Sequence, residues 1–399
     1  MKILFVVEAA SPHAARWINQ LRSTDWDIHV FQAYYESQSV SGDLCCGSLY
    51  VPYPARPLAG VRLIQTVPTI RGVRRSRLLR DLIDMAHHRY LDSLIRELRP
   101  DVIHSLGMNV NWRNLCLPVL AAKRRLDKSF VSPWIYSSWG TDLSYYAALS
   151  GSHMKEVVRV LTACDYLIAE CQRDVRLARE LGFRGELAGC YPAFGGVRVI
   201  ETRRYCQGGA VASRSLIYLK GRHLDDRVGR AMTALDAFQQ SSAELSAYDI
   251  IVGQASPEIA AKAVELSVQD AMRIHVLPHL PYGLLLRLVG HCKASLSLTV
   301  NDGLPSTLVE AMALGAFPIY SDLESIREWI RDGLNGFLVP AEDSQALAAA
   351  LKAMLKDDNL VESAAKINLG IVNQQLSEEV IKPKVVSMYS KIARGEPVL

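Results

Sequence analysis

The sequence has little of what marks a membrane, secreted or redox-active protein. No apolar run approaches the roughly 20 residues that span a bilayer. Met1 leads directly into the strand-like Lys2–Val7, without a charged, apolar and cleavable series, so we expect no signal peptide. The eight cysteines are scattered, Cys45 and Cys46 are the only close pair, and no Cys-x-x-Cys occurs, which favours reduced thiols. These absences predict a cytoplasmic protein.

Motifs for cofactors and metals are missing as well. No Gly-x-Gly-x-x-Gly follows Ile3–Val7, which argues against a nicotinamide enzyme. No Asp-x-Asp follows a strand and no His/Cys cluster has ligand spacing, so we expect no metal site and no cofactor. The net charge of +4 is too small to indicate a nucleic-acid partner. With 399 residues, 49% hydrophobic and 22% charged, the chain suits an α/β protein of two domains.

The first half alternates short apolar strands with helical stretches. A helix is predicted over Pro12–Leu21, and a long amphipathic one over Leu78–Leu98, which Pro100 ends. Strands separated by helices imply crossover connections and a parallel sheet. The strands predicted in this half are Ile3–Val7, Asp27–Phe31, Asp101–Ser105, Trp134–Ser138 and Tyr166–Glu170.

A second α/β series follows a glycine-rich stretch between Pro192 and Arg214, which we interpret as a hinge. The predicted domains are therefore 1–195 and 210–375, two Rossmann-like, doubly wound parallel sheets that face a cleft, where ligands of such folds bind. A last segment, 376–399, is expected to return as a helix to the first domain. The strands of the second series are Leu216–Leu219, Asp249–Val252, Ile274–Leu277, Ala294–Leu298, Phe317–Tyr320 and Phe337–Val339.

The segment Asn301–Gly315 has the residues of an anion site at a helix start. Pro305 fits the first helical position, and the backbone N–H groups of Ser306 and Thr307 would point out of the helix toward a diphosphate. Glu310 follows Ser306 by four residues, so it lies about 6 Å further along the same face, within reach of a ribose. Asp302 lies in the approach loop. The alternative is that Asp302 caps a loop and Glu310 is a solvated helix residue.

This block, which continues to Gly336, resembles the C-terminal domain of the family-4 retaining glycosyltransferases, which have the GT-B fold. In that family two acidic residues bracket seven others. Asp302 and Glu310 have that spacing, with Asp in place of the usual first Glu. The resemblance implies that the donor-binding residues here are Asp302, Gly303, Leu304, Pro305, Ser306, Thr307 and Glu310.

The family also places cations after the first strand of this domain. The stretch Leu219–Arg230 offers Lys220, Arg222 and Arg230 for the diphosphate, and the alternative is a basic surface turn. The resemblance implies a UDP- or GDP-sugar as donor substrate. We expect the base near Leu277–Tyr282.

The N-terminal domain has two further landmarks of the family, Pro100–His104 and Trp139–Asp142. The second usually begins with a histidine near the transferred sugar, where this chain has Trp139. The residues predicted to be catalytic are Asp142, His13, His104 and Trp139. For the two histidines and Asp142, a structural role is the alternative.

Five arginines lie within Arg71–Arg80, and a second basic patch within Lys123–Arg125. They predict contact either with anionic lipid head groups at the inner membrane face or with a phosphorylated acceptor, and the alternative is two solvated helix surfaces.

The resemblance implies a retaining transferase that moves a hexose from a nucleotide sugar to a hydroxyl of a glycan or lipid-linked acceptor, in bacterial cell-surface polysaccharide synthesis. The alternatives are a nucleotide-sugar or glycan binder without transferase activity, and a sugar-nucleotide epimerase on the same fold.

Overall fold

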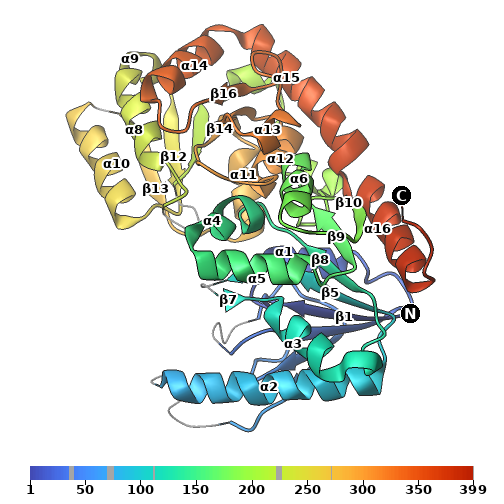
Figure 1. Ribbon diagram of the computed structural model, residues 1–399. Helices are drawn as coiled ribbons and strands as arrows, with labels where there is room; N and C mark the ends of the chain where they lie inside the picture. Colours follow the sequence, from blue (N-terminus) through green and yellow to red (C-terminus); the bar gives the residue numbers. More distant parts are fainter. Residues whose placement is uncertain (36–39, 70–75, 111–112, 222–226, 271, 399) are drawn as a thin grey trace. The chain divides into compact units, whose positions relative to one another are not determined.

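The computed structural model describes residues 1–35, 40–69, 76–110, 113–221, 227–270 and 272–398 (Figure 1). Contacts divide the chain into two compact units. Unit 1 comprises Met1–Gly196 and Ile381–Leu399, and unit 2 comprises Val197–Val380. Among the described residues, no helix is both long enough and apolar enough to cross a membrane.

Over its described residues, unit 1 forms an eight-stranded sheet with the order β10-β9-β8-β5-β1-β2-β3-β4, and its strand pairs are parallel. The predicted parallel sheet is therefore confirmed, and β3, β4 and β10 are additional to the prediction. The strands are β1 Lys2–Val7, β2 Asp27–Gln32, β3 Ser48–Val51, β4 Arg62–Gln65, β5 Val102–Leu106, β8 Trp134–Ser137, β9 Tyr166–Ala169 and β10 Glu186–Cys190, and β6 Asn109–Val110 pairs with β7 Arg113–Asn114 as a separate ribbon.

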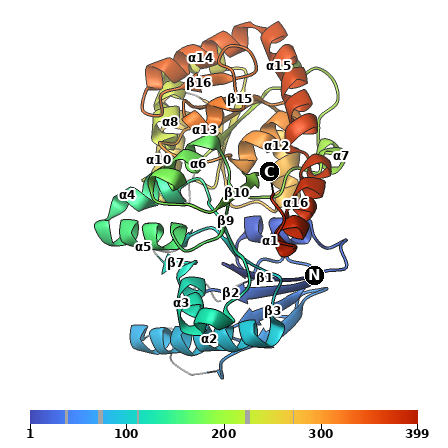
Figure 2. The same cartoon turned by 45° about the vertical axis from the view of Figure 1, so that its right-hand side comes forward.

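Strand β1 shows why the sheet of unit 1 is covered on both faces. Ile3, Phe5 and Val7 enter one hydrophobic core, whereas Leu4 and Val6 enter the other, because successive side chains of a strand point to opposite faces. Helices α1 (Pro12–Asn19) and α16 (Glu378–Ala393) contribute to the first core, and α3 (Leu117–Leu126) and α5 (Gly151–Leu161) contribute to the second, where α2 (Arg77–Leu98) packs on α3. Figures 1 and 2 show these layers.

Unit 2 has a six-stranded parallel sheet over its described residues, with the order β13-β12-β11-β14-β15-β16. Helices lie on both faces, and those that carry the site or its supports are α7 (Val199–Arg203), α8 (Ala231–Gln240), α10 (Pro257–Gln269), α11 (Tyr282–Val289), α12 (Ser306–Leu314), α14 (Ser344–Lys356) and α15 (Asp358–Ile371). The strands are β11 Leu216–Lys220, β12 Asp249–Gly253, β13 Ile274–Leu277, β14 Cys292–Ser297, β15 Phe317–Ser321 and β16 Phe337–Val339.

The stretch that we interpreted as a hinge is structured where it enters unit 2. Residues 197–215 belong to unit 2 and include α7 and a short 3-10 helix at Val211–Ser213. At the other end of the unit, α16 begins at Glu378, and its residues from Ile381 onward belong to unit 1. There the Tyr389 hydroxyl accepts a hydrogen bond from Trp17 Nε1 at 2.9 Å.

Candidate functional site

The strand order of unit 2 reverses beside β11, which lies between β12 and β14. The loops that leave β11 and β14 at this point are joined by backbone hydrogen bonds, from Arg230 N to Leu298 O at 2.9 Å and from Val300 N to Val228 O at 2.9 Å. Doubly wound sheets bind ligands in the crevice at the carboxyl ends of the strands where the order reverses. The sheet topology therefore marks this edge of unit 2 as the place for a ligand.

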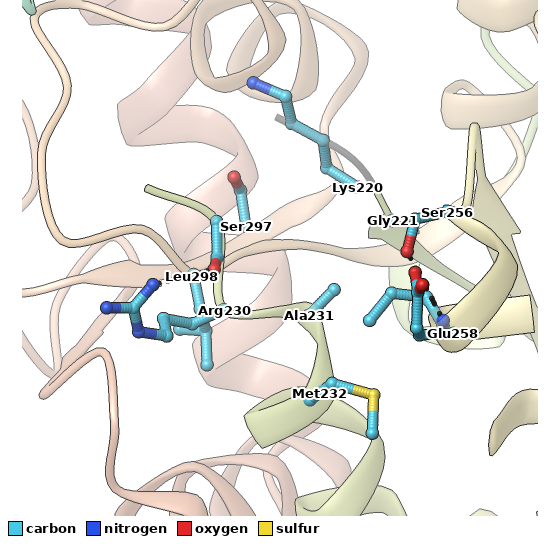
Figure 3. A pocket seen from close by; sticks show the side chains of 11 residues that line it. Lys220, Gly221, Arg230, Ala231, Met232, Ser256, Glu258, Ser297 and Leu298 are labelled. Atoms are coloured by element: carbon cyan, nitrogen blue, oxygen red, sulfur yellow. Dashed lines mark hydrogen bonds between the residues drawn. The ribbon is translucent and has the colours of Figure 1, made fainter. Parts of the chain in front are cut away.

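A pocket of about 300 Å³ occupies that crevice (Figure 3). Lys220, at the end of β11, and Arg230, just before α8, both belong to its lining. Its lining also includes Ser256 and Glu258 at the start of α10, and Ser297 at the end of β14. The structure thus brings two of the predicted donor-binding cations together, while Arg222 lies outside the described residues.

Gly221 follows Lys220 at a position where a side chain does not fit. A Cβ atom there would lie 2.7 Å from Val252 Cγ1 and 2.9 Å from the Gly253 carbonyl oxygen. Glycine is needed because the chain leaving β11 passes close to the end of β12. Because of this close approach, backbone atoms form the rim of the pocket at Gly221.

The Arg230 guanidinium is already held within unit 2. Its Nε lies 2.9 Å from Glu342 Oε1, and its Nη1 donates to the carbonyls of Arg227 at 2.7 Å and Gly229 at 3.0 Å. Glu342 is 71% exposed, so water screens this ion pair. A bound anion would therefore compete with Glu342 for the guanidinium.

Helix α12 begins at Ser306, one residue later than predicted. Pro305 has the extended values φ −63° and ψ 130°, and its carbonyl accepts from the N–H groups of Leu308 and Val309. Among the described residues, no side chain caps this helix start. Because the first N–H groups of a helix lack partners within the helix, Ser306 and Thr307 present theirs outward, as an anion site requires.

The residues of the loop before α12 differ in burial and in their hydrogen bonds. Leu304 and Pro305 are buried, so their side chains belong to the protein interior and only their backbone is suited to a ligand. Asp302 is half-buried and its Oδ1 accepts from Gly303 N at 2.9 Å, while its carbonyl accepts from Ser325 Oγ at 2.8 Å. The loop is thereby fixed to the segment after β15.

Two arginines from the segment 197–214 bind the other end of α12. Arg203 Nη1 donates to Ala313 O at 3.0 Å, and Arg214 Nη1 donates to Leu314 O at 3.1 Å. The helix ends at Gly315, whose φ of 84° requires the left-handed region. Cations at a helix C-terminus offset its partial negative charge. This role is not visible in the sequence, because both arginines lie in the glycine-rich stretch that we interpreted as a hinge.

Glu310 is 3% exposed, which corrects the alternative of a solvated helix residue. Its Oε1 accepts a hydrogen bond of 2.9 Å from the Tyr282 hydroxyl, at the start of α11. Burial, reinforced by the charge of Glu310, raises the pKa of Tyr218 and raises that of Tyr320 to about 12. Tyr282 was predicted near the base, and its bond to Glu310 was not anticipated.

In unit 1, the structure places His104, which we predicted to be catalytic, inside the hydrophobic interior. The side chain is 0% exposed on β5, and both ring nitrogens are bound, Nδ1 to Tyr389 Oη at 2.6 Å and Nε2 to Ser137 Oγ at 2.7 Å. Burial lowers the pKa of the imidazole to about 3, so it remains neutral. His104 therefore links β5, β8 and α16 instead of facing a substrate.

Asp142 is likewise buried and bound from within unit 1. Its Oδ2 accepts from Met108 N at 2.8 Å, from Trp139 N at 2.9 Å and from Tyr136 Oη at 3.0 Å. Beside it, Glu170 Oε2 accepts from Gly140 N at 2.6 Å. These carboxylates fix the turn after β8, so in this structure Asp142, which we predicted to be catalytic, positions a loop.

The other two predicted catalytic residues of unit 1 lie beside each other. The rings of His13, in the first turn of α1, and Trp139 meet edge to face, with centroids 6.1 Å apart. Trp139 also covers Gly107, where a Cβ atom would lie 2.7 Å from Trp139 Cε3. Trp139 is half-buried. His13 and Trp139 therefore remain the residues of unit 1 that we predict to contact the substrates.

Within the described ranges, no group of three or more His, Cys, Asp or Glu side chains could hold a metal ion. The basic patch Lys123–Arg125 is largely paired, since Lys123 binds Asp165 at 3.2 Å and Arg125 binds Asp92 at 2.6 Å.

Comparison with known proteins finds a family model that matches part of unit 2. Residues 229–368 match the family model of the glycosyl transferases group 1. A phosphatidyl-myo-inositol mannosyltransferase of Mycobacterium leprae is 41% identical over 86 residues, 22% of this chain and 23% of that relative. The matched stretch thus spans less than a quarter of the relative's length.

Solved structures are similar over the whole chain. HepE of Anabaena, in complex with UDP and glucose, has a TM-score of 0.70 at 15% identity, over 98% of this chain and 100% of its own. Sucrose-phosphate synthase of Thermosynechococcus elongatus has a TM-score of 0.69 at 14% identity, over 99% and 100%. These similarities confirm the predicted GT-B fold of two Rossmann-like units. Residues 229–368 therefore match the glycosyl transferases group 1, within a chain that has the GT-B fold.

Proposed function

We propose that this chain is a retaining hexosyltransferase that uses a UDP- or GDP-sugar. The observation that carries the proposal is the pocket at the switch point of a group 1 domain, lined by Lys220 and Arg230. Two cations in one crevice suit a diphosphate, which bears at least two negative charges. HepE of Anabaena, which has the same fold, binds UDP and UDP-glucose.

In this proposal the diphosphate binds between the two cations and the start of α12. The N–H groups of Ser306 and Thr307 supply donors, and the helix dipole favours the negative charge. Glu310 accepts from the ribose hydroxyls, and Asp302 binds the sugar being transferred. The cations and the helix start would stabilise the charge that builds up as the nucleoside diphosphate leaves.

The retaining course follows from the resemblance to family-4 enzymes. The acceptor hydroxyl attacks the anomeric carbon on the face from which the diphosphate leaves, and the departing phosphate oxygen takes up the hydroxyl proton. No protein nucleophile is required. With His104 and Asp142 engaged inside unit 1, Trp139 and His13 are the proposed contacts on the reaction side, Trp139 by stacking on a sugar face.

The proposed acceptor is a glycan or a lipid-linked oligosaccharide of a bacterial cell surface. An amphipathic surface of α2 supports contact with a membrane, because Leu78, Leu82 and Met85 are exposed at helical spacing and Arg77 and Arg89 are exposed beside them. The arginines of Arg71–Arg75 lie outside the described residues.

Membrane contact is tested by co-sedimentation with phosphatidylglycerol vesicles and with phosphatidylcholine vesicles. We expect binding to the anionic vesicles alone, and its loss in Leu82→Glu/Met85→Glu. The control is Val268→Glu, at a valine of α10 that is 79% exposed. Equal binding of both variants would contradict a role for α2.

A second candidate function is nucleotide-sugar or glycan binding without transfer. The internal engagement of His104 and Asp142 favours it, because neither side chain is placed to act on a substrate. Release of UDP or GDP from the corresponding sugars separates the two functions, since a binder releases no nucleotide. An epimerase would change the sugar without an acceptor.

The transferase proposal is tested by donor turnover with UDP- and GDP-hexoses in the variants Glu310→Ala and Arg230→Ala. We expect each to lower turnover by about a hundredfold, which corresponds to about 2.7 kcal/mol of lost binding and transition-state stabilisation. The control is Arg273→Ala, since Arg273 forms a 3.3 Å ion pair with Asp249 at the amino-terminal edge of the sheet, away from the pocket. Wild-type turnover in Glu310→Ala would refute the donor site.

A further inference from the structure

Two exposed side chains, Gln254 and His279, are joined at the ends of neighbouring strands of unit 2. Gln254 is the first residue after β12, and His279 follows the end of β13 by two residues. The amide Nε2 of Gln254 lies 2.6 Å from His279 Nδ1. The two strands are parallel, so both residues lie at the carboxyl edge of the sheet, where doubly wound folds bind ligands.

The chain on either side of Gln254 connects this pair to the pocket. The Gly253 carbonyl accepts from Gly221 N at 2.8 Å, and Gly221 belongs to the lining of the pocket. A Cβ atom at Gly221 would lie 3.2 Å from Ala255 Cα. The next residue, Ser256, lines the pocket as well (Figure 3). Gln254 therefore lies in a short segment that borders the crevice proposed for the donor.

The backbone of Gln254 has a conformation that glutamine rarely adopts. Its φ is 57°, in the left-handed region, which is uncommon for residues other than glycine, asparagine and aspartate. Its N–H donates to the Leu277 carbonyl at 3.0 Å, which fixes this turn to the end of β13. Strained positions of this kind cluster at functional sites. A glycine would suit the turn better, so the use of the side chain accounts for glutamine here.

The direction of the hydrogen bond between the two side chains sets the tautomer of His279. An amide nitrogen donates and does not accept, so His279 Nδ1 is the acceptor and the proton of the neutral ring is on Nε2. Among the described residues, no second hydrogen bond to this ring is found. His279 therefore offers one N–H donor at the ligand edge, and Gln254 fixes the plane of the ring that carries it.

We propose that Gln254 and His279 select the nucleobase of the donor, an inference that rests on the proposed donor site. His279 Nε2–H donates to a carbonyl oxygen of the base, and Gln254 is the positioning residue that holds the imidazole. Uracil and guanine have an oxygen where cytosine and adenine have an amino group, which is itself a donor. Two donors that face each other both stay unpaired, so the site disfavours the amino bases.

The test titrates the full chain calorimetrically with UDP, CDP, GDP and ADP at pH 8, where a free imidazole is neutral. In the wild type we expect UDP to bind more tightly than CDP, or GDP more tightly than ADP, by at least about tenfold. The substitution His279→Phe keeps a ring and removes the N–H. It should reduce this preference to less than about twofold.

The positioning role is tested with Gln254→Gly. Glycine adopts a φ of 57° without strain, so the variant should fold about as stably as the wild type, while the base preference should fall by about threefold or more. The matched control is His275→Phe, at an exposed histidine of β13 whose Nε2 lies 2.9 Å from Asp249 Oδ1, at the amino-terminal edge of the sheet. It should leave the base preference unchanged.

Nitrogen NMR of protein labelled with ¹⁵N-histidine supplies a second measurement. Protonated and bare ring nitrogens differ in chemical shift, and the signals of His279 are those that disappear in His279→Phe. We expect a protonated Nε2 and a bare Nδ1 in the wild type, and a mixture of tautomers in Gln254→Gly. A purely structural role for Gln254 would not change the tautomer.

Several results would overturn the inference alone. They are a wild type that binds carbonyl and amino nucleotides equally or prefers the amino ones, a proton on Nδ1, and a base preference that survives in His279→Phe or in Gln254→Gly. An equal loss for all four nucleotides in His279→Phe would also overturn it, because the ring would then only stack on the base. If the wild type binds none of the four nucleotides, the donor-site proposal itself fails, and this inference fails with it.

Discussion

The substitution Asp142→Asn distinguishes a catalytic carboxylate from one that holds a loop. In the wild type one oxygen accepts three hydrogen bonds of 2.8 to 3.0 Å, two from backbone N–H groups and one from Tyr136. Hydrogen bonds to a charged group are worth about 1.5–3 kcal/mol and neutral ones about 0.5–1.5 kcal/mol. A neutral amide should therefore lose about 1 kcal/mol per bond, or about 3 kcal/mol in total.

The loss is measured as the change in the free energy of unfolding of unit 1 in urea. Asp25→Asn, at an exposed aspartate of the same unit, is the control and should change it by less than about 0.5 kcal/mol. Binding of UDP or GDP should be unchanged in both, because the donor-site residues belong to unit 2. If Asp142→Asn kept wild-type stability and yet lost transfer more than about a hundredfold, the carboxylate would act on the substrate and the loop assignment would be wrong.

Three further outcomes are expected. Tyr389→Phe should lower the free energy of unfolding by about 2–5 kcal/mol, because it leaves buried groups of Trp17 and His104 unpaired; a loss below about 1 kcal/mol would contradict this network. Glu342→Gln should tighten UDP or GDP binding by up to about fivefold, since it releases Arg230 from an exposed ion pair, and weaker binding would refute the competition. Stability should fall as the pH drops below about 6.5, because two buried histidines and the half-buried His88 have folded-state pKa values of about 3 to 4 and the unfolded chain takes up the protons first. Urea unfolding at pH 7.5 and 5.5 should differ by about 1.4 kcal/mol per histidine, and equal values would contradict the lowered pKa values of His87, His88 and His104.

The fold could be predicted because its signals are local. Apolar strands such as Ile3–Val7 and the helical spacing of Leu78–Leu98 depend on neighbours within a few residues, and the helix is found at Arg77–Leu98. The strands β3 and β4, each of four residues, were missed because among the described residues no helix separates β2, β3 and β4, so the alternation of strand and helix does not mark them. At this length, pairing with a neighbouring strand decides the conformation more than the sequence does.

The candidate site was predictable in part for the same reason. The helix start at Pro305–Thr307 and the spacing of Asp302 and Glu310 can be followed within one stretch of chain, and Lys220 and Arg230 lie ten residues apart around one loop. For His104 and Asp142 in unit 1, the sequence does not show what the side chain binds. A histidine or an aspartate at the end of a strand gives the same sequence pattern whether its partner is a substrate or another side chain.

The sequence by itself determined two α/β units, the position of α12 and the residue types at the proposed donor site. The tertiary structure decided which group each side chain binds: Tyr389 for His104 across 285 residues, Glu342 for Arg230 across 112, and Tyr282 for Glu310 across 28. Such partners are brought together only when strands and helices from distant parts of the chain pack. Burial and hydrogen bonding therefore assign His104 to the core of unit 1 and place Glu310 beneath Tyr282.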